Sequence, residues 1–343
     1  MKYIGYYIYL LHEKYGGAED RAIEFERKFN EYCAENGVDI RIKRIMTDED
    51  LELVEAVIIY GAHYKNHAIV KYLKDRYKVK IILSSVFVKN GPSLLYKLLS
   101  KINKPKTTQR MIYEIMNDSD YIFTSTAFEK EMLRKIFGVE NAKIDILPNL
   151  IDDKYILSKI DDNLKLPIDN KTISKSYVCV GRIEPIKNQL ILENIGENII
   201  FIGNYNNEFE EYYNKFRVMV NKNKEFTHIA RVQKDVLFNI VNKSKGLIMP
   251  SLFETTGRVA LEAAVLNKPL ILSNIDTIKE YLDEYNKVRY FNPRDKKELR
   301  KAVVELNNLN DDVTEDLDFM FCYSRGIKIY VNYLKNILND NGE

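Results

Sequence analysis

The sequence contains no apolar run long enough to cross a lipid bilayer. Its longest apolar runs, near residues 57–60 and 269–272, are far shorter than the roughly 18 residues that a membrane-spanning helix needs. Residues 3–11 are followed by a glycine turn and lack the small-residue cleavage site of a signal peptide. We therefore expect no transmembrane segment and no signal peptide, and we interpret residues 3–11 as the first strand.

Cysteine is also scarce. The chain has 3 cysteines, Cys33, Cys179 and Cys322, which are widely separated and not in the spacing of metal ligands. This pattern argues against a disulfide framework and against a cysteine zinc site. We expect each cysteine to pack as a small buried hydrophobic residue in a protein of the reducing cytoplasm.

An excess of charge of one sign is missing from the chain as a whole but present in one stretch. The formal net charge of +2 gives no global reason to expect binding to nucleic acid or to a membrane. Residues 71–110, in contrast, carry eleven lysines or arginines against the single acid Asp75. We expect this stretch either to meet something anionic or to form a solvated face. Its cations are Lys71, Lys74, Arg76, Lys78, Lys80, Lys89, Lys97, Lys101, Lys104, Lys106 and Arg110.

The length and the pattern of the chain indicate the fold. At 343 residues it exceeds the size at which one hydrophobic core keeps growing. Short β-branched or aromatic runs alternate with helical segments such as 18–36 and 127–137, which is typical of βαβ units. The sequence therefore predicts an α/β fold with two Rossmann-like domains, each doubly wound around a parallel sheet. The expected strands are 3–11, 56–60, 80–85, 121–125 and 144–147, then 177–180, 198–202, 226–229, 246–249, 269–272 and 288–291.

A linker separates the two halves. Residues 149–176 are rich in Asp, Asn and Lys, contain Pro167 and lack a strong strand pattern. We assign residues 1–160 to an N-terminal domain and residues 170–318 to a C-terminal domain. Residues 319–338 carry apolar side chains at helical spacing, and we expect this last helix to dock back onto the N-terminal domain.

Candidate phosphate ligands follow two of the predicted strands. Ligands of open parallel sheets bind beyond the carboxyl ends of the strands, beside helix N-termini. Gly16 and Gly17 follow the first strand and would let the backbone approach an anion, although they equally suit a plain tight turn. Arg182 and Lys187 follow the strand 177–180. An arginine fork and a lysine ammonium suit a diphosphate, and a solvated basic loop is the alternative.

Two carboxylates follow the strand 246–249. Glu254 stands in the loop, and Glu262 lies about two helical turns further along, roughly on the same side. Carboxylates accept hydrogen bonds from paired hydroxyls, so this pair suits a sugar ring and a ribose. Thr255, Thr256 and Gly257 would offer helix N-terminal amides to a phosphate. A helix N-terminal charge plus an exposed glutamate is the other interpretation.

Taken in order, these motifs resemble the donor site of the retaining GT-B glycosyltransferases of family 4, the glycosyl transferases group 1. The resemblance covers nearly the whole chain and is strongest from residue 181 to residue 274. It implies the GT-B fold, in which two Rossmann-like domains face each other across a cleft. The matching residues are Gly181-Arg182, Lys187, Pro250-Ser251, Glu254 and, after seven intervening residues, Glu262, together with Gly16-Gly17 and Leu147-Pro148-Asn149.

The resemblance implies a reaction and a role for each residue. A sugar would pass from a nucleotide-linked donor, UDP- or GDP-linked, to an acceptor hydroxyl with retention at the anomeric carbon. Arg182 and Lys187 would hold the diphosphate, Glu254 would bind hydroxyls of the donor sugar, and Glu262 would bind the ribose. Gly17 would lie near the phosphates or the acceptor.

The resemblance also implies that transfer needs no metal and no other cofactor. None of the predicted strands is followed directly by an Asp-X-Asp metal signature. His63, after the strand 56–60, stands where the family often has a cleft histidine; an ordinary surface histidine is the alternative. Thr255-Thr256 replace the Phe-Gly that family members often carry, and Ala230 replaces a glycine, so the motifs do not name the donor sugar.

The N-terminal domain of this family receives the acceptor, so the basic stretch bears on what is glycosylated. Residues 94–104 interleave leucines with lysines in a basic amphipathic helix, as at anionic membrane surfaces. A lipid-linked or polyanionic glycan acceptor at the inner face of the membrane would suit this pattern. The phosphate backbone of a nucleic acid suits it less well, and a solvated face remains open.

Two other classes of function compete with a transferase. A sugar-nucleotide epimerase shares the two-domain fold, but it needs its own acid and base in the cleft, and the spacing of Glu254 and Glu262 favours a transferase. A non-catalytic binder of polyanions or membranes would use the basic stretch. Such a binder has no need for Arg182, Lys187 and the two glutamates together.

Overall fold

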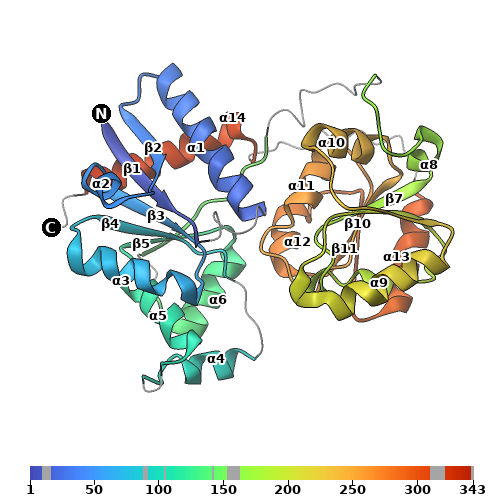
Figure 1. Ribbon diagram of the computed structural model, residues 1–343, viewed down its shortest axis with the longest axis horizontal. Helices are drawn as coiled ribbons and strands as arrows, with labels where there is room; N and C mark the ends of the chain where they lie inside the picture. The colour runs from blue at the N-terminus through green and yellow to red at the C-terminus, as the bar shows by residue number, and fades with distance from the viewer. Residues whose placement is uncertain are drawn as a thin grey trace. The chain divides into compact units, whose positions relative to one another are not determined.

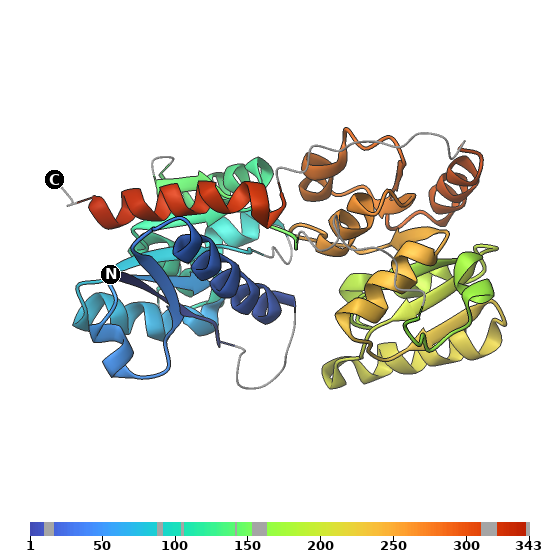
Figure 2. The same cartoon turned by 90° about the horizontal axis from the view of Figure 1, so that it is seen from above.

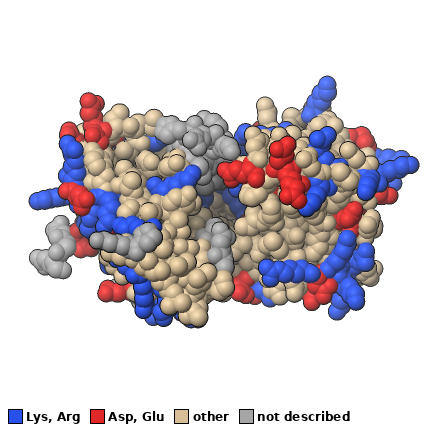
Figure 3. Space-filling view, turned by 60° about the horizontal axis from the view of Figure 1, so that its bottom comes forward, with Lys and Arg blue, Asp and Glu red and all other residues tan. Residues whose placement is uncertain are grey.

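The chain folds into two compact units (Figures 1 and 2). The computed structural model describes residues 1–9, 17–87, 92–103, 106–140, 143–152, 163–309 and 321–340. Unit 1 comprises Met1–Leu150 and Met320–Glu343, and unit 2 comprises Ile151–Phe319. Charged side chains of both signs are spread over the visible surface of each unit (Figure 3). Residues 160 and 318–319, at which domain and helix boundaries were expected, lie outside the described ranges.

Unit 1 is built on a six-stranded sheet in the order β2-β1-β3-β4-β5-β6. All of its strand pairs are parallel, with Ile4 opposite Ala56 and Ile82 opposite Tyr121. Its strands are β1 (Lys2–Tyr7), β2 (Ile40–Arg44), β3 (Ala56–Tyr60), β4 (Lys80–Ser84), β5 (Tyr121–Thr124) and β6 (Ile144–Ile146). Its helices are α1 (Gly17–Glu35), α2 (Asp48–Glu52), α3 (His67–Arg76), α4 (Ser93–Leu99), α5 (Thr108–Asp118), α6 (Ala127–Phe137) and α14 (Tyr323–Asn339).

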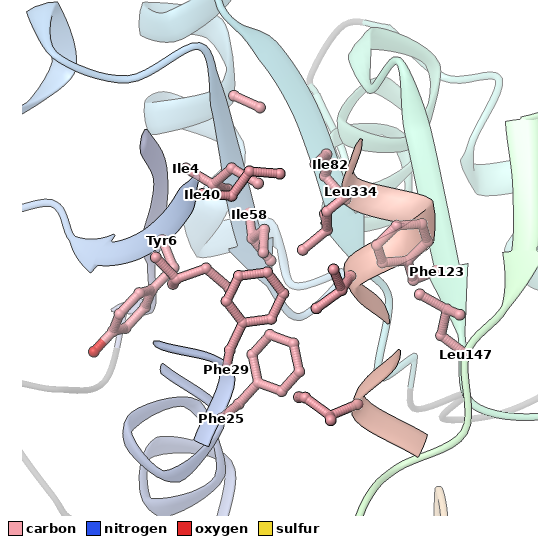
Figure 4. Close-up of a cluster of buried hydrophobic side chains, with 14 of the residues drawn as sticks. Ile4, Tyr6, Phe25, Phe29, Ile40, Ile58, Ile82, Phe123, Leu147 and Leu334 are labelled. Carbon is pink, nitrogen blue, oxygen red and sulfur yellow. The ribbon is translucent and has the colours of Figure 1, made fainter. Parts of the chain in front are cut away.

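Successive side chains of a strand point to opposite faces, so the sheet of unit 1 supports two cores. Ile58 and Ile82 join the core beneath α1 and α14. Figure 4 shows this core, with Phe25 and Phe29 of α1 and Leu334 of α14 meeting the sheet. The neighbouring strand residues face the other way, toward α3, α5 and α6; they are Val57, Ile59, Ile81 and Leu83. Helix α14 therefore covers a face that the first 150 residues leave half covered.

Unit 2 repeats the plan with a six-stranded sheet in the order β12-β11-β10-β7-β8-β9, all parallel. Helices α9 and α13 pack on one face, where Phe216 and Leu299 contact the strand residues of the core. Its strands are β7 (Ser176–Val180), β8 (Asn198–Ile202), β9 (Phe226–Ile229), β10 (Gly246–Met249), β11 (Leu270–Ser273) and β12 (Val288–Phe291). Its helices are α8 (Asn170–Ser174), α9 (Glu210–Lys222), α10 (Lys234–Lys243), α11 (Arg258–Val265), α12 (Asp276–Leu282) and α13 (Lys296–Asn307).

The two parallel, doubly wound sheets confirm the predicted fold class. One strand was missed: β2, whose sequence Ile-Arg-Ile-Lys-Arg alternates apolar and charged residues at the edge of the sheet. Ile40 and Ile42 are buried while the three cations reach outward, as is typical of a charged edge strand. The first strand also ends earlier than expected, at Tyr7. No helix in the described part of the chain combines the length and apolarity needed to span a bilayer.

Candidate functional site

The sheet of unit 2 has a topological switch point between β7 and β10. The chain adds β8 and β9 on one side of β7 and then returns to place β10, β11 and β12 on the other side. The loops that follow β7 and β10 therefore come together at the carboxyl edge of the sheet, the edge at which open α/β sheets bind ligands. Arg182 and Lys187 lie on the first loop, and Glu254 lies on the second.

Lys187 and Glu254, one on each of these two loops, contact each other. The Lys187 ammonium lies 2.6 Å from Oε1 of Glu254, and the Ser251 hydroxyl donates to the same oxygen at 2.6 Å. The two charged side chains are only 24% and 12% exposed, so water screens the pair weakly. The hydroxyl of Thr277 donates to the Glu254 carbonyl at 2.6 Å and fixes the backbone on the other side. The sequence predicted both residues for one site, and the structure joins them directly.

Arg182 is the outermost cation of the site. Its side chain is 60% exposed, and its Nη2 lies 3.2 Å from Oε1 of the buried Glu184. Its carbonyl accepts a hydrogen bond from the Gln189 amide at 2.8 Å, and Tyr212 donates to that amide's oxygen at 3.1 Å. The backbone of the loop is therefore held in place while the guanidinium can reach into solvent.

Asn188 ties the loops together and was missed by the sequence reasoning. It adopts a left-handed conformation, with φ of +55°, which asparagine tolerates better than most residues. Its side-chain amide donates to the carbonyls of Pro250, at 3.1 Å, and Pro293, at 2.8 Å. A backbone bond from Leu252 to Ile186, at 2.8 Å, joins the same loops. The asparagine directly after Lys187 was the available signal.

Helix α11 starts beside Glu254. Its N-cap is Gly257, with φ of +63° and no side-chain cap; a Cβ there would lie 3.0 Å from the Met249 methyl. Thr256 and Gly257 are buried, and Thr255 is half-buried. Glu262, on the helix, accepts a hydrogen bond from Nε of Arg258 at 3.1 Å. The two glutamates therefore have different cationic partners, Lys187 for one and Arg258 for the other.

The strand ends of unit 1 hold fewer charges. Gly16 lies outside the described residues, and Gly17 begins α1. His63 follows β3 at the switch point between β1 and β3. It caps a 3₁₀ turn through Nδ1, which accepts from the Lys65 amide at 3.3 Å, and its ring packs on Tyr64. Partial desolvation of the ring, and then the charge of Lys65, hold the pKa of His63 below its usual 6.5. The imidazole is thus neutral at pH 7.

A small cavity of about 40 Å³ opens near the carboxyl ends of β3, β4, β5 and β6. Arg21 points into it and was not predicted; its guanidinium donates to Asn149 and, at 3.2 Å, to Ser84. It also lies 5.5 Å from the centre of the Tyr60 ring. The cavity has room for water but not for a sugar ring, and its arginine already has partners, so we assign it a structural role.

The missed strand β2 is followed by an Asp-X-Asp sequence, Asp48-Glu49-Asp50, that the sequence analysis did not consider. Asp50 caps α2: its Oδ2 accepts from the amides of Met46 and Thr47, and its Oδ1 lies 2.7 Å from Lys43. The Lys43 bond, with those from the backbone, lowers the pKa of Asp50 to about 2. Tyr72 donates to Asp48 at 3.0 Å. Within the described ranges no group of three or more potential ligands gathers to hold a metal ion.

Comparison with known families locates the similarity in unit 2. Residues 177–316 match the glycosyl transferases group 1 family. The matched segment begins in β7 and contains every predicted donor-site residue of unit 2: Arg182, Lys187, Glu254, Thr255, Thr256, Gly257 and Glu262.

A curated relative extends the match. The chain is 23% identical over 204 residues to the O-antigen chain mannosyltransferase RfbU of Salmonella typhimurium. The aligned part covers 59% of this chain and 55% of that protein. The chain therefore matches little more than half the length of this relative.

Solved structures match over almost the whole chain. A glycosyltransferase from Rickettsia africae gives a TM-score of 0.69 at 13% identity, covering 99% of both chains. Sucrose-phosphate synthase from Thermosynechococcus elongatus gives a TM-score of 0.66 at 13% sequence identity, and the match covers 100% of this chain and 98% of that one. Anabaena Alr3699/HepE, in complex with UDP and glucose, gives a TM-score of 0.65 at 12% sequence identity, and the match covers 97% of this chain and 95% of that one. The chain has the GT-B fold.

Proposed function

We propose that this protein is a retaining glycosyltransferase. It transfers a sugar from a UDP- or GDP-linked donor to a hydroxyl of a glycan acceptor, without a metal ion. One observation carries the proposal: the contact between Lys187 and Glu254 at the switch point of unit 2, with Arg182 beside it. Both loops lie in the segment that matches the glycosyl transferases group 1 family.

The two cations suit a nucleoside diphosphate leaving group. Arg182 is exposed enough to turn its planar fork toward two phosphate oxygens. Lys187 has three N–H donors, so it can keep its bond to Glu254 and still donate to a phosphate. The N-terminus of α11, without a side-chain cap, adds a positive dipole. These groups stabilise the negative charge that grows as the bond to the sugar breaks.

The glutamates suit the hydroxyls of the donor. Oε1 of Glu254 accepts from both Lys187 and Ser251, which leaves Oε2 to accept from hydroxyls of the sugar. Glu262 would bind the ribose hydroxyls. Neither carboxylate needs to attack the sugar, because retention in this proposal comes from attack on the face that the nucleotide leaves. His63 would donate a hydrogen bond from Nε2–H to a substrate oxygen, because its Nδ1 already accepts from the Lys65 amide and a neutral ring then carries its proton on Nε2.

The choice of acceptor rests on the descriptions of similar proteins. The curated relative is described as an O-antigen chain mannosyltransferase, and the Anabaena structure contains UDP and glucose. These descriptions favour a nucleotide-linked donor and a glycan acceptor, lipid-linked or polyanionic, over nucleic acid. We accordingly place the enzyme in the cytoplasm, at the inner face of the membrane.

A nucleotide-release assay tests the proposal. The wild type and the variants Glu254→Gln, Arg182→Ala and Lys187→Met are incubated with UDP-, GDP- and ADP-sugars, in EDTA, with a glycan acceptor extract. We expect release from one donor and a loss of at least about 100-fold in kcat for Glu254→Gln, because a preorganised contact to the donor is removed. NMR of the product should show the donor's anomeric configuration.

The chain offers a matched control for this assay. Lys245 and Glu197 form a second pair at 2.7 Å, with side chains 32% and 12% exposed. They precede β10 and β8, so they lie at the amino edge of the same sheet, away from the switch point. Glu197→Gln should therefore cost similar stability but leave kcat unchanged. Equal loss in both variants, or no turnover of any donor, would refute the proposed site. Sugar-nucleotide conversion without acceptor would indicate an epimerase instead.

A further inference from the structure

Helix α4 exposes its apolar side chains instead of burying them. We call Leu94, Leu95, Leu98 and Ile102 the α4 ridge; they are 68%, 47%, 55% and 40% exposed. The helix is anchored to unit 1 chiefly through Tyr96, which is buried and packs edge-on against Phe87 and Phe137. A surface helix normally turns such residues toward the core, so α4 presents an apolar strip to a partner.

A basic groove of about 280 Å³ lies beside the ridge. Five cations and no carboxylate line it: Lys97, Lys101, Arg110, Arg134 and Lys135. The two arginines are balanced by Glu114 and Glu131. Over the ranges that the structure describes, the side-chain ammonium groups of the three lysines form no ion pair or hydrogen bond. Like charges gathered around one groove, without acids among them, favour an anionic partner.

Four cations of the predicted basic stretch, Lys71, Lys74, Lys106 and Arg110, pair with acids that follow the stretch in the sequence. Lys71 pairs with Asp118 at 2.6 Å, and Lys74 with Asp120 at 3.4 Å. Glu114 accepts from Lys106 as well as from Arg110. Lys89 and Lys104 lie outside the described residues. This pairing offsets part of the positive charge expected over residues 71–110, but not that of Lys97 and Lys101 beside the groove.

We propose that the ridge and the groove together dock on an anionic lipid bilayer. The leucines enter the boundary between headgroups and acyl chains, and the lysines meet headgroup phosphates. Lys97 lies between Leu95 and Leu98 on the same short helix, so one surface offers both contacts. A soluble polyanion would match the lysines and leave the ridge in water. Figure 3 shows the underside of unit 1 with an uncharged area bordered by Lys and Arg side chains.

Sedimentation with vesicles tests the charged half of the surface. Binding to vesicles of phosphatidylcholine with about 30% phosphatidylglycerol is compared with binding to phosphatidylcholine alone, at about 0.1 M salt. Each lysine near an anionic bilayer contributes roughly fivefold in affinity. The double variant Lys97→Gln/Lys101→Gln should therefore bind anionic vesicles about 30-fold more weakly than the wild type. The control Lys171→Gln/Lys175→Gln loses the same charge from exposed residues of unit 2 and should bind as the wild type does.

A second pair of variants tests the ridge. Leu94→Ser/Leu98→Ser should weaken binding to anionic vesicles about tenfold or more, because two leucines no longer leave water. Leu53→Ser/Val304→Ser removes apolar side chains that are 62% and 59% exposed elsewhere, and should change nothing. Thermal melts confirm that all four variants fold.

Three results would overturn the inference. One is equal binding to neutral and anionic vesicles, and another is wild-type binding by both α4 variants. The third is binding to heparin that depends on the lysines while vesicle binding is absent, which would indicate a soluble polyanion. Sedimentation measures binding without turnover, so this inference and the proposed transferase activity can fail separately.

Discussion

Gly203 ends β8 at a place where another backbone comes too close for any side chain. An added Cβ would lie 2.0 Å from the carbonyl oxygen of Gly181 and 2.7 Å from its carbon. Gly203 also has a φ of +158°. The same loop carries Arg182, so this contact sets the path of a proposed phosphate-binding segment. Gly203→Ala should therefore disturb both the stability of unit 2 and the donor site.

The size of the effect can be worked from the hydrogen bonds nearby. Contacts below 3.0 Å are essentially never seen for a real Cβ, so the two strand ends must separate by about 1 Å. This strains the bonds from Gly181 to Ile202, at 3.0 Å, from Gly203 to Ile229, at 2.9 Å, and from Ile183 to Asn204, at 2.9 Å. Weakening three such bonds costs about 2–3 kcal/mol, and the backbone conformation adds about 1 kcal/mol.

A thermal melt of the unit 2 transition measures this cost. A loss of about 3–4 kcal/mol should lower Tm by roughly 10 °C for a unit of this size. The matched control is Gly196→Ala: Gly196 has a φ of +83°, but its added Cβ would meet nothing within 4 Å. It carries the conformational cost alone, so its Tm should fall by only about 3 °C. Equal Tm values for the two variants would refute the clash as the cause.

Three further predictions concern single side chains. Asn188→Ala should lower the free energy of unfolding of unit 2, measured in urea, by about 2–3 kcal/mol, because it removes the hydrogen bonds to Pro250 and Pro293 and places alanine at a φ of +55°. Asn188→Gly should recover the part of this loss that comes from the left-handed backbone conformation. Burial raises the pKa of Glu114, but hydrogen bonds from Lys106, His67 and Arg110 outweigh this and lower the value from 4.5 to about 2; the resulting stability is present above pH 4.5 and lost toward pH 2, so Glu114→Gln should flatten acid unfolding by about 1–2 kcal/mol. If Nε2–H of His63 donates to a substrate oxygen, protonation of Nδ1 would break the bond from the Lys65 amide that orients the ring, so wild-type turnover should fall as the pH drops through the lowered pKa of His63, and His63→Gln should lack that limb in a pH–rate profile.

The strands were largely predictable because parallel strands buried on both faces are short apolar runs. The expected 198–202, 226–229, 246–249 and 288–291 coincide with the observed strands. We did not predict β2 because three of its five residues are charged and only Ile40 and Ile42 are buried. Helix α4 was expected to carry leucines between lysines, but periodicity alone could not tell which way the leucines point. The burial of Tyr96 decides it.

For the candidate site, the sequence could place Lys187 and Glu254 at strand ends, but it could not predict the contacts that they make. Strand ends place Lys187 and Glu254 at one edge of the sheet, yet their direct pairing depends on the strand order, which brings β7 beside β10. We did not predict the roles of Asn188 and Gly203, because they depend on backbone geometry. Asn188 forms a left-handed turn and Gly203 allows a close approach of two backbones, and neither can be read from a pattern of side chains. The basic stretch was overestimated because its partners Glu114, Asp118 and Asp120 lie just beyond it in the sequence.

The division of the core of unit 1 between the two ends of the chain sets an order of events during synthesis. Six side chains of that core, from Tyr323 to Leu338, belong to α14. They leave the ribosome after all of unit 2, whose strands are contiguous in the sequence. Unit 2 can therefore close its sheet on the nascent chain, while the N-terminal sheet waits with one apolar face incomplete. The nascent N-terminal half therefore keeps apolar surface exposed until α14 has been synthesised.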